Sequence, residues 1–502
     1  MAKKGYLAFD LGAGSGRAIL GTLEDGRLEL EEVHRFENAV KSENGGLYWD
    51  AENLFDNLIG GLRKGGEFAR QKNIRLASVG VDTWGVDYAL IGEDGRLVSP
   101  LRNYRDKRNP SAMEEVLAEV GKEEIYSITG IQFMPINTLY QLRAHQKIDP
   151  EAIKRTRRFF MMPDLMHYFL SGKETNEITI ASTSQMLEAN TPKVWSKKLI
   201  GLTGLREDAF GELINPGTYI GNVRREIAER AGISGDVKVI VPASHDTAGA
   251  VIAAPVTSDK NWCYISSGTW SLFGAELPTP KVDIASFESG FANEAGINGT
   301  TRMLKNVQGM WFFQQCGAHY GRDNPGELLE QAQKAREIDC VIDPDSLRFS
   351  QHGNMPLKIQ RFAEDSGQDI PLTEGEVVKV CGQSLAVAYR HVLDKLEGLL
   401  EKRFETIHII GGGAYNYLVN QMTADATGRR VVAGPYEGSS IGNVLTQAMG
   451  DGKIENLEEA RRIVAASFET KVYEPKKINA NWENLLGNYC TLVRLRRELE
   501  KS

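Results

Sequence analysis

Residues 7–21 read LAFDLGAGSGRAILG, an apolar run, a turn of glycine and serine, and a second apolar run. Residues 263–274 read CYISSGTWSLFG and repeat that shape. Glycine and serine let each turn reach conformations that other residues avoid, and such turns can offer backbone N–H groups to an anion. Two hairpins of this kind predict two related lobes that act on one phosphate chain.

The glycine-rich turns differ from two common nucleotide-binding motifs. No lysine followed by serine or threonine closes either run, as a Walker loop requires. The first turn leads into alternating strand residues at 18–22, whereas a dinucleotide fingerprint leads into a helix. A single hairpin of this type is more often an ordinary tight turn. The repeat, together with Asp10 at the end of the first apolar run, favours phosphate binding.

Length and composition indicate two domains. The chain has 502 residues, which is more than one core usually supports, and 41% of them are hydrophobic and 25% charged. We expect lobes at residues 1–250 and 251–502. The net charge of −8 and the scattered basic residues argue against nucleic acid and favour a small-molecule or nucleotide ligand. The sequence leaves a monomer and a homodimer equally open.

The N-terminus and the cysteines predict a cytoplasmic protein. Residues 1–6 pass directly into the first strand without an apolar signal core. No apolar run approaches the roughly 20 residues of a membrane helix, so we expect no membrane partner. The five cysteines lie far apart without the paired spacing of zinc sites, which predicts reduced structural thiols. The histidines outside Ser244–Thr247 show no metal-ligand spacing either.

Strand and helix patterns alternate along the chain, which predicts an α/β fold with mixed sheets. Asp50 can cap a helix that follows it, and the last helical pattern has an apolar stripe that we expect to pack within the protein. We expect strands at 28–36, 76–82, 178–187, 237–241 and 406–410, and helices at 51–69, 417–427 and 482–499.

Two strand ends carry candidate catalytic and sugar-binding groups. Ser244-His245-Asp246-Thr247 follows the strand at 237–241, and an acid in that place can accept a hydroxyl proton during phosphoryl transfer. Helix capping by Asp246 explains the dipeptide equally well. Residues 82–87, DTWGVD, place two acids around an aromatic and a glycine, which suits a sugar with hydroxyls and apolar ring faces. For Trp84 alone, a place in the core is the better explanation.

Two later segments carry candidate ligand contacts. Gly411-Gly412-Gly413 follows an apolar strand and lets a ligand approach the backbone, while the next helix N-terminus favours negative charge or adenosine contacts. A sharp strand-to-helix turn would give the same sequence. Residues 304–311 join a strand to a helix, and Asn306 and Gln308 offer uncharged hydrogen bonds there unless they face solvent.

In chain order, these segments together resemble the FGGY carbohydrate kinases. The resemblance runs from residue 7 to about residue 449, and the joint pattern is far more specific than any one segment. It is closest to the family members that act on a 6-deoxyketose. Many FGGY kinases carry Lys-apolar-x-Trp where this chain has Thr138-Leu139-Tyr140-Gln141, and that subfamily shares the departure. The motifs that carry the resemblance lie at 10–17, 82–87, 130–142, 244–247, 266–271 and 411–413.

The resemblance implies two α/β lobes of the actin, Hsp70 and hexokinase type, with mixed sheets around a central cleft for sugar and ATP. It implies transfer of the γ-phosphoryl group of ATP to O1 of L-rhamnulose with Mg²⁺. Asp246 is then the proton acceptor, and Asp10 organises Mg²⁺ through waters. The implied sugar-side residues are Gly85, His245, Asp246, Thr247 and Asn306. The implied ATP-side residues are Ala13, Gly14, Ser15, Gly16, Arg17, Thr269, Gln314, Gly411, Gly412 and Gly413.

Some positions depart from the family pattern, and other functions stay open. Gly14 stands where a second serine is usual, and Ala414-Tyr415-Asn416 replaces a common Cys-Gln-Asn, yet no essential group is lost. L-fuculokinase or another ketose kinase is the first alternative, because such sugars differ at few stereocentres. A catalytically silent sugar or nucleotide sensor is the second, and the presence of Asp246 argues against it. A nucleotide-gated chaperone would need a peptide-binding domain for which no residues are left over.

Overall fold

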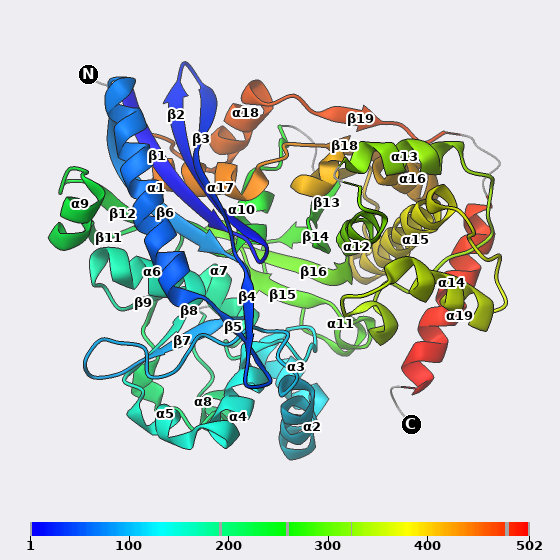
Figure 1. Cartoon of the computed structure of the whole chain (residues 1–502), viewed down its shortest axis with the longest axis horizontal. Coiled ribbons are helices and arrows are strands. Elements are labelled where there is room, and N and C mark those ends of the chain that lie inside the picture. The colour runs from blue at the N-terminus through cyan, green and yellow to red at the C-terminus, as the bar shows by residue number, and fades with distance from the viewer. Residues whose placement is uncertain (1–2, 190–192, 258–260, 323, 477–480, 500–502) are drawn as a thin grey trace. The chain divides into compact units, whose positions relative to one another are not determined.

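The structure is a computed structural model, and it describes residues 3–189, 193–257, 261–322, 324–476 and 481–499 (Figure 1). The chain forms two compact units, each assembled from separate segments. Unit 1 contains Met1–Thr257, Glu276–Met303 and Gly438–Ser467, and unit 2 contains Ser258–Ala275, Leu304–Glu437 and Phe468–Ser502. The lobes expected at 1–250 and 251–502 stay a prediction.

Unit 1 alternates strands and helices. Its elements are β1 (Lys3–Leu11), β2 (Ser15–Glu24), β3 (Arg27–Glu37), β4 (Val40–Glu43), β5 (Gly46–Trp49), α1 (Ala51–Gln71), β6 (Ile74–Thr83), β7 (Tyr88–Ile91), α2 (Asn109–Val120), α3 (Lys122–Thr129), α4 (Thr138–Ile148), α5 (Pro150–Arg155), β8 (Arg158–Met161), α6 (Met162–Ser171), β9 (Thr175–Glu177), α7 (Ile178–Ala181), α8 (Lys197–Gly201), β10 (Glu212–Ile214), β11 (Thr218–Asn222), α9 (Arg225–Ala231), β12 (Lys238–Val241), α10 (Asp246–Ile252), α11 (Ile284–Ser289), β15 (Ala292–Ala295), α17 (Gly438–Gly450) and α18 (Leu457–Ser467).

A six-stranded mixed sheet forms the centre of unit 1, in the order β11-β12-β6-β1-β2-β3. β1 pairs with β6, and β6 with β12, in parallel, whereas β1–β2, β2–β3 and β11–β12 are antiparallel. The parallel strands bring their carboxyl ends to one edge of the sheet. The predicted N-terminal hairpin is confirmed as β1–β2, and Gly12 N donates to Ser15 O at 2.9 Å inside its turn.

The two faces of this sheet are covered by helices from opposite ends of the sequence (Figure 1). Successive residues of a strand point to opposite faces. Phe9 points to α1, where a Cβ added at Gly61 would lie 2.5 Å from its ring, so the glycine permits this close approach. Asp10 points the other way and accepts a hydrogen bond from Ser440 of α17 at 3.1 Å. The helix expected at 51–69 is confirmed as α1, with Asp50 accepting from Asn53 N at its N-terminus.

The expected strand at 178–187 is wrong. Residues 178–181 form α7, and Ser182–Ser184 continue as a short 3₁₀ turn. The cause is Glu177, whose carboxylate accepts hydrogen bonds from the backbone N–H groups of Thr179 and Ile180. Such capping outweighs the strand preference of the β-branched residues that follow.

Unit 2 contains β13 (Trp262–Ser267), α12 (Trp311–Tyr320), α13 (Pro325–Lys334), α14 (Met355–Asp365), α15 (Glu374–Leu400), β17 (Thr406–Ile410), α16 (Tyr417–Thr427), β18 (Arg430–Ala433), β19 (Lys471–Tyr473) and α19 (Trp482–Leu499). The chain crosses between the units within β14 (Trp270–Leu277) and β16 (Thr301–Gln308). These strands belong to a seven-stranded sheet of order β15-β16-β14-β13-β17-β18-β19, in which β13–β14 is the predicted second hairpin.

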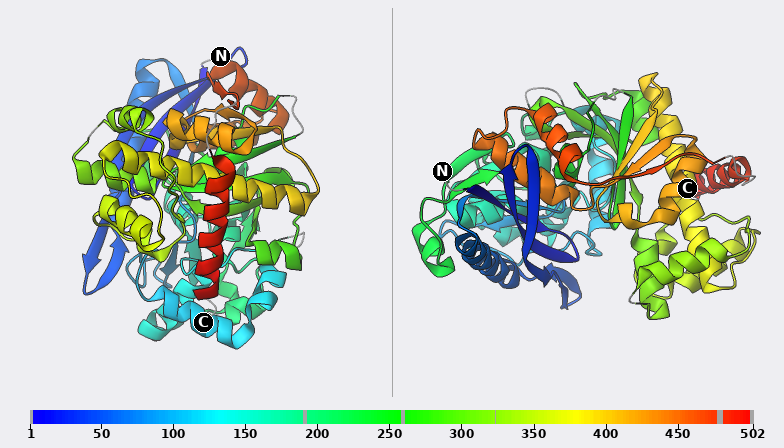
Figure 2. Two further views of the ribbon diagram at one scale, coloured as in Figure 1. Left: turned by 90° about the vertical axis from the view of Figure 1, so that its right-hand side faces the viewer. Right: turned by 90° about the horizontal axis from the view of Figure 1, so that it is seen from above.

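The long helix α15 organises the helical part of unit 2. Thr373 and Glu376 close its N-terminus as a capping box, in which each side chain accepts from the other residue's backbone N–H. α13, α16 and α19 all pack against α15, and Figure 2 shows α19 lying across it. The C-terminal amphipathic helix is therefore confirmed as a packed element of the protein. The strand at 406–410 and the helix at 417–427 are confirmed as β17 and α16.

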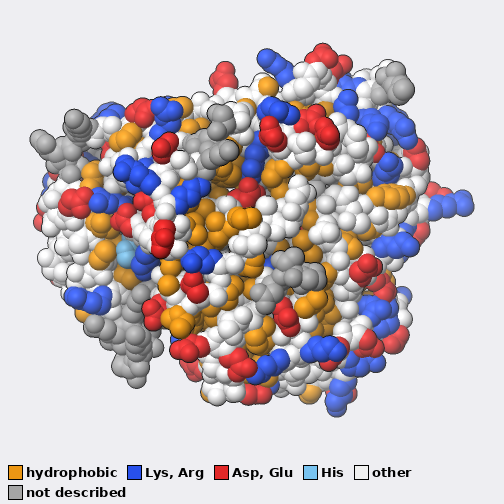
Figure 3. Space-filling view, turned by 180° about the vertical axis from the view of Figure 1, so that it is seen from behind, with side chains coloured by type: hydrophobic (Ala, Val, Ile, Leu, Met, Phe, Trp, Pro, Cys, Tyr) orange, Lys and Arg blue, Asp and Glu red, His pale blue; other side chains and the backbone are white. Residues whose placement is uncertain are grey.

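The surface carries mixed charge. On the face drawn in Figure 3, Lys and Arg side chains alternate with Asp and Glu side chains rather than gathering into one basic area. Among the helices of the described residues, none combines the length and apolar character needed to span a bilayer. None of the five cysteines forms a disulfide bond, and Cys490 is the exposed one.

Candidate active site

Three acidic residues of unit 1 stand at the carboxyl ends of neighbouring parallel strands. Asp10 and Asp82 lie near the ends of β1 and β6 and are opposite each other in the register. Asp246 opens α10 after β12. Because parallel strands bring their carboxyl ends to one edge, loops at this edge of an α/β sheet commonly form ligand sites.

Asp10 is held by a cation from the facing strand. Arg17 lies opposite it in the β1–β2 register and donates to Asp10 Oδ2 from Nη2 at 2.8 Å and from Nε at 3.2 Å. Ser440 Oγ donates to the same oxygen. These contacts fix the end of β1 beside the glycine-rich turn at 12–16.

Asp82 is a buried carboxyl with one satisfied oxygen. Asn443 Nδ2 of α17 donates to Oδ2 at 2.6 Å, while Oδ1 has no hydrogen-bond partner among the described residues. Burial raises the pKa of Asp82 well above its ordinary value, and the nearby charge of Asp10 adds to this. Over the part of the chain that the structure describes, no three His, Cys, Asp or Glu side chains gather closely enough to cage a metal ion.

Asp246 is the accessible acid of the three, since 33% of its side chain is exposed. Its Oδ1 accepts from Thr247 N at 2.5 Å and from Thr247 Oγ1 at 3.1 Å, and His245 Nε2 lies 3.4 Å away. The surrounding protein nevertheless desolvates the carboxylate and raises its pKa. A carboxylate with a raised pKa is a stronger proton acceptor, and this one remains within reach of a ligand.

The backbone before Asp246 is anchored by Glu177, a buried residue that the sequence did not single out. Glu177 Oε2 accepts from Ser244 N at 3.1 Å, and Thr179 Oγ1 accepts from His245 N at 3.2 Å. Burial raises the pKa of Glu177. Glu177 and Thr179, at the start of the helix that replaces the expected strand at 178–187, thus hold the candidate catalytic loop.

The loop after β6 contains a strained residue next to Gly85. Val86 has φ of +67°, a left-handed conformation that is unfavourable for a β-branched side chain. Its N–H donates to Thr183 Oγ1 at 3.1 Å, and its carbonyl accepts from Thr138 Oγ1 at 2.6 Å. A Cβ added at Gly85 would lie 3.3 Å from His245 Nε2, so the glycine backbone closely faces this imidazole.

Asp87 ties the same loop into the core. Its carboxylate accepts from the indole N–H groups of Trp49 at 2.5 Å and Trp84 at 2.9 Å, and from Gln141 Nε2 at 3.0 Å. Burial raises the pKa of Asp87 to about 6, although these donors oppose the rise. Trp84 is 5% exposed and packs on Trp49, which confirms the core explanation for this residue.

In unit 2, the second hairpin and the triple-glycine turn lie together. A Cβ added at Gly411 would be 3.0 Å from Ser267 O, and one at Gly413 would be 1.9 Å from Ser267 Oγ. Thr269 Oγ1 and Gln314 Nε2 are 3.4 Å apart. Beyond the glycines, the rings of Tyr415 and Tyr436 stack with their centroids 3.6 Å apart.

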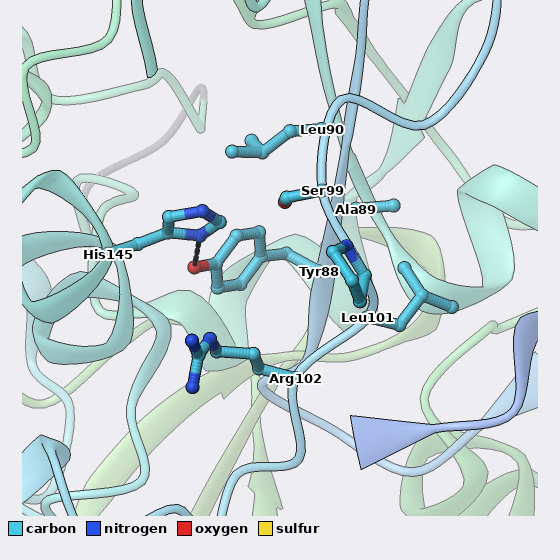
Figure 4. Close-up of a pocket in the computed structure, with 8 residues that line it drawn as sticks. Tyr88, Ala89, Leu90, Ser99, Leu101, Arg102 and His145 are labelled. Carbon is cyan, nitrogen blue, oxygen red and sulfur yellow. Dashed lines mark hydrogen bonds between the residues drawn. The ribbon is translucent and has the colours of Figure 1, made fainter. Parts of the chain in front are cut away.

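A separate hollow in unit 1 is closed to ligands. Tyr88, Ser99, Arg102 and His145 are among the residues that line it, and Tyr88 Oη lies 2.8 Å from His145 Nδ1 (Figure 4). The space does not admit a water molecule. Burial lowers the pKa of His145 to about 4, as expected of a core histidine with a hydrogen-bond partner.

The predicted site residues therefore fall into two groups. Unit 1 holds Asp10, the turn residues 13–17, Gly85 and His245–Thr247, and unit 2 holds Thr269, Asn306, Gln314 and Gly411–Gly413. Asn306 was expected beside the sugar; it lies on β16 in unit 2. The supporting residues Glu177, Glu294, Arg302 and Asn443 were not predicted. Glu177 caps α7, but glutamate is not among the usual N-cap residues, so no sequence pattern pointed to this role.

Family models for the N-terminal and C-terminal domains of the FGGY family of carbohydrate kinases match residues 5–253 and 263–450. The chain belongs to this family. The FGGY chain is 38% identical to a rhamnulokinase from Bacteroides thetaiotaomicron over 492 residues, 98% of this chain and 100% of the relative. It is also 38% identical to a rhamnulokinase from Bacillus subtilis over 94% of this chain and 96% of that protein.

Solved structures of two other sugar-related kinases match the fold over almost the whole chain. A ligand-bound xylulose kinase from Lactobacillus acidophilus matches with a TM-score of 0.81 and 16% identity, covering 99% of both chains. A gluconate kinase from the same organism matches with a TM-score of 0.79 and 16% identity, covering 98% of both. At such low identity these structures support the fold alone, and they confirm the expected α/β kinase fold with mixed sheets.

Proposed function

We propose that this FGGY kinase is a rhamnulokinase, which transfers the γ-phosphoryl group of ATP to O1 of L-rhamnulose. The products are L-rhamnulose 1-phosphate and ADP. The observation that carries the proposal is the 38% identity to proteins named rhamnulokinase over nearly the full length of both chains. The chain carries Thr138-Leu139-Tyr140-Gln141 where many FGGY kinases carry Lys-apolar-x-Trp, and this departure also supports the proposal.

Asp246 acts as the proton acceptor in this proposal. The O1 oxygen attacks the γ-phosphorus as its proton passes to Asp246, and the bond from the γ-phosphorus to the β,γ-bridging oxygen breaks to release ADP. Asp246 then returns the proton to solvent. Its partly exposed side chain and raised pKa support this role. We assign Gly85, His245, Thr247 and Asn306 to sugar binding.

The two glycine-rich hairpins and the triple-glycine turn serve the nucleotide. We assign Ala13–Arg17, Thr269, Gln314 and Gly411–Gly413 to ATP. Small residues let a phosphate chain approach the backbone N–H groups, and a Cβ at Gly14 would meet no described atom within 4 Å. The open space at Gly14 supports phosphate binding at the first turn.

The residues at the end of β1 fit a magnesium ion held through water. Mg²⁺ prefers oxygen ligands and usually keeps several waters while one or two carboxylates hold it. Asp82 Oδ1 is a buried carboxyl oxygen without a partner among the described residues, and Asp10 stands opposite it in the strand register. We assign Asp10 as the residue that would organise the ion. When bound, Mg²⁺ would neutralise phosphate charge.

We also propose that the enzyme works in the cytoplasm as a monomer or homodimer, with ketose and ATP as its partners. Its five cysteines form no disulfide bond and four of them are buried, which suits a reducing compartment. Size-exclusion chromatography with light scattering distinguishes the two oligomeric states.

Coupled ADP release with Mg·ATP tests the proposed function. Turnover is measured on L-rhamnulose, L-fuculose, L-ribulose, D-xylulose and glycerol, ranked by kcat/KM, with Asp246→Asn as the inactive control. We expect a clear preference for L-rhamnulose. Preference for another ketose would replace the substrate but keep the kinase, and no sugar-dependent turnover would overturn the proposal.

A further inference from the structure

A buried ion pair lies behind the imidazole of His245. Glu294 on β15 and Arg302 on β16 place Oε2 and Nη2 2.9 Å apart, and their side chains are 6% and 1% exposed. Both residues belong to unit 1, as do His245 and Asp246. Removing two charges from water is costly, so a pair buried this deeply requires good geometry or a functional reason.

The pair meets one nitrogen of His245, and Asp246 faces the other. His245 Nδ1 lies 3.1 Å from Arg302 Nη2 and 3.2 Å from Glu294 Oε2. The contact with Arg302 has hydrogen-bond geometry, whereas the contacts of Glu294 Oε2 are at ion-pair distance without it. On the opposite side of the ring, Nε2 lies 3.4 Å from Asp246 Oδ1, which is also ion-pair distance.

This geometry selects where the imidazole carries its proton. A guanidinium can only donate, so a hydrogen bond from Arg302 makes Nδ1 the acceptor and leaves the ring proton on Nε2. In this tautomer an N–H group faces the Asp246 carboxylate. The other neutral form would instead turn a lone pair toward that negative charge.

Further contacts fix the pair itself. Arg302 Nε donates to Ala295 O at 3.0 Å, and Ala295 N donates to Ser182 Oγ at 3.0 Å. Burial opposes ionisation of Glu294, yet Arg302 and His245 hold its pKa below the ordinary value, so Glu294 keeps the charge that holds the guanidinium. The backbone of His245 is held separately, through Thr179. His245 is thus held both at its backbone N–H and at its ring nitrogen Nδ1.

We propose that Glu294 and Arg302 are positioning residues, which hold His245 with its Nε2 proton toward Asp246 and thereby orient the carboxylate for transfer of the substrate hydroxyl proton. This inference rests on the proposed kinase function. His245 keeps its proton throughout, and the hydroxyl proton goes to Asp246. Neither Glu294 nor Arg302 touches the substrate in this arrangement.

The test first replaces Arg302, the donor to His245, and then replaces both residues of the ion pair. Arg302→Met removes the donor to Nδ1 and leaves Glu294 as an acceptor there, so we expect the ring proton to move to Nδ1. We expect kcat to fall about 10- to 100-fold on the preferred ketose, with KM for ATP within about twofold of wild type. The double variant Glu294→Gln/Arg302→Met removes the unpaired charge and should regain Tm without regaining kcat.

A matched control separates this role from plain stabilisation. Arg429 and Glu397 form a comparable partly buried pair in unit 2, at 3.0 Å with side chains 15% and 18% exposed. Arg429→Met should lower Tm and leave kcat of the folded enzyme unchanged. A double variant with wild-type kcat, or an Arg302→Met variant that changes Tm alone, would refute the positioning role.

A spectroscopic measurement keeps the inference testable if the proposed function fails. Histidine ¹⁵N NMR, with the His245 signals assigned by their loss in His245→Asn, reports which nitrogen carries the proton. We expect an Nε2 proton in the wild type and an Nδ1 proton in Arg302→Met. Absence of turnover on every sugar, with this change in protonation intact, would reject the kinase proposal alone. An Nδ1 proton alone in the wild type would reject the inference.

Discussion

The Ser244–Thr247 loop of unit 1 and the Gly411–Gly413 turn of unit 2 are held in place by different means. Buried charged side chains, Glu177 below the backbone and Glu294 behind the imidazole, hold the loop. The turn is held by backbone that packs on Ser267, with no room for a side chain at Gly411 or Gly413. The loop should therefore be sensitive to charge and the turn to volume.

The largest effect is expected from Asp246→Asn, which removes the proton acceptor from the loop and keeps its shape. We expect kcat to fall by about 10² or more, because a positioned general base commonly contributes 10²–10⁴-fold. Coupled ADP release measures kcat, and sugar binding by calorimetry should be retained. Near-normal turnover would show that Asp246 is not the base.

The next effect concerns the pH dependence of stability. The pKa of Asp87 is about 6 in the folded protein against 3.8 ordinarily, so the folded state binds this proton more tightly than the unfolded state. The free energy of unfolding should therefore fall as pH rises from about 4 to about 6, by up to about 3 kcal/mol from this group.

Urea unfolding between pH 4 and 7 measures the contribution of Asp87. Asp87→Asn loses acceptor capacity toward Trp49 and Trp84 and should be less stable, but its unfolding free energy should decline less steeply over this range. Equal slopes for the variant and the wild type would contradict the prediction.

A smaller effect tests the sensitivity of the turn to volume. The Cβ of Gly413→Ala would overlap Ser267 Oγ, so β13 or the turn must shift. We expect the unfolding free energy to fall by roughly 1–3 kcal/mol and KM for ATP to rise by about tenfold. Gly412→Ala is the matched control, since its Cβ meets no described atom within 4 Å. Similar results for the two variants would break the comparison.

The smallest effect is expected at the first hairpin. Gly14→Ser introduces the residue that is usual in the family at a position with open space around the Cβ. KM for ATP should stay within about twofold, as for other unstrained surface changes. Gly16→Ser is its contrast, because a Cβ there would lie 2.2 Å from the Phe36 ring. ATP titrations of both variants measure the difference.

Local patterns predicted much of the fold. Both hairpins, the strand containing Asp82 and the helix capped by Asp50 depend on neighbouring residues, and all are confirmed. The strand expected at 178–187 was wrong because periodicity does not register the side-chain cap of Glu177. The motifs named the candidate base, but not the residues that support it.

The supporting residues were missed because their contacts are distant in sequence. Asn443 reaches Asp82 across 361 positions, and Arg302 reaches His245 across 57. No spacing rule for helices or strands relates such pairs. A buried arginine in a strand is unusual enough to single out Arg302, but its partner becomes apparent only from the fold.

The contacts of α17 also set an order of events during synthesis. Asn443 and Gln447 bond to Asp82 and Ser78 of β6, and Gln447 bonds to Leu7 O of β1. The sheet of unit 1 is synthesised first. One of its faces therefore stays uncovered until α17 is translated, after most of unit 2. At typical translation rates the stretch from residue 257 to residue 438 takes roughly 10–40 s. During that interval this face of the nascent sheet lacks the hydrogen bonds and packing that α17 supplies, and a chain that stops within this stretch never gains them.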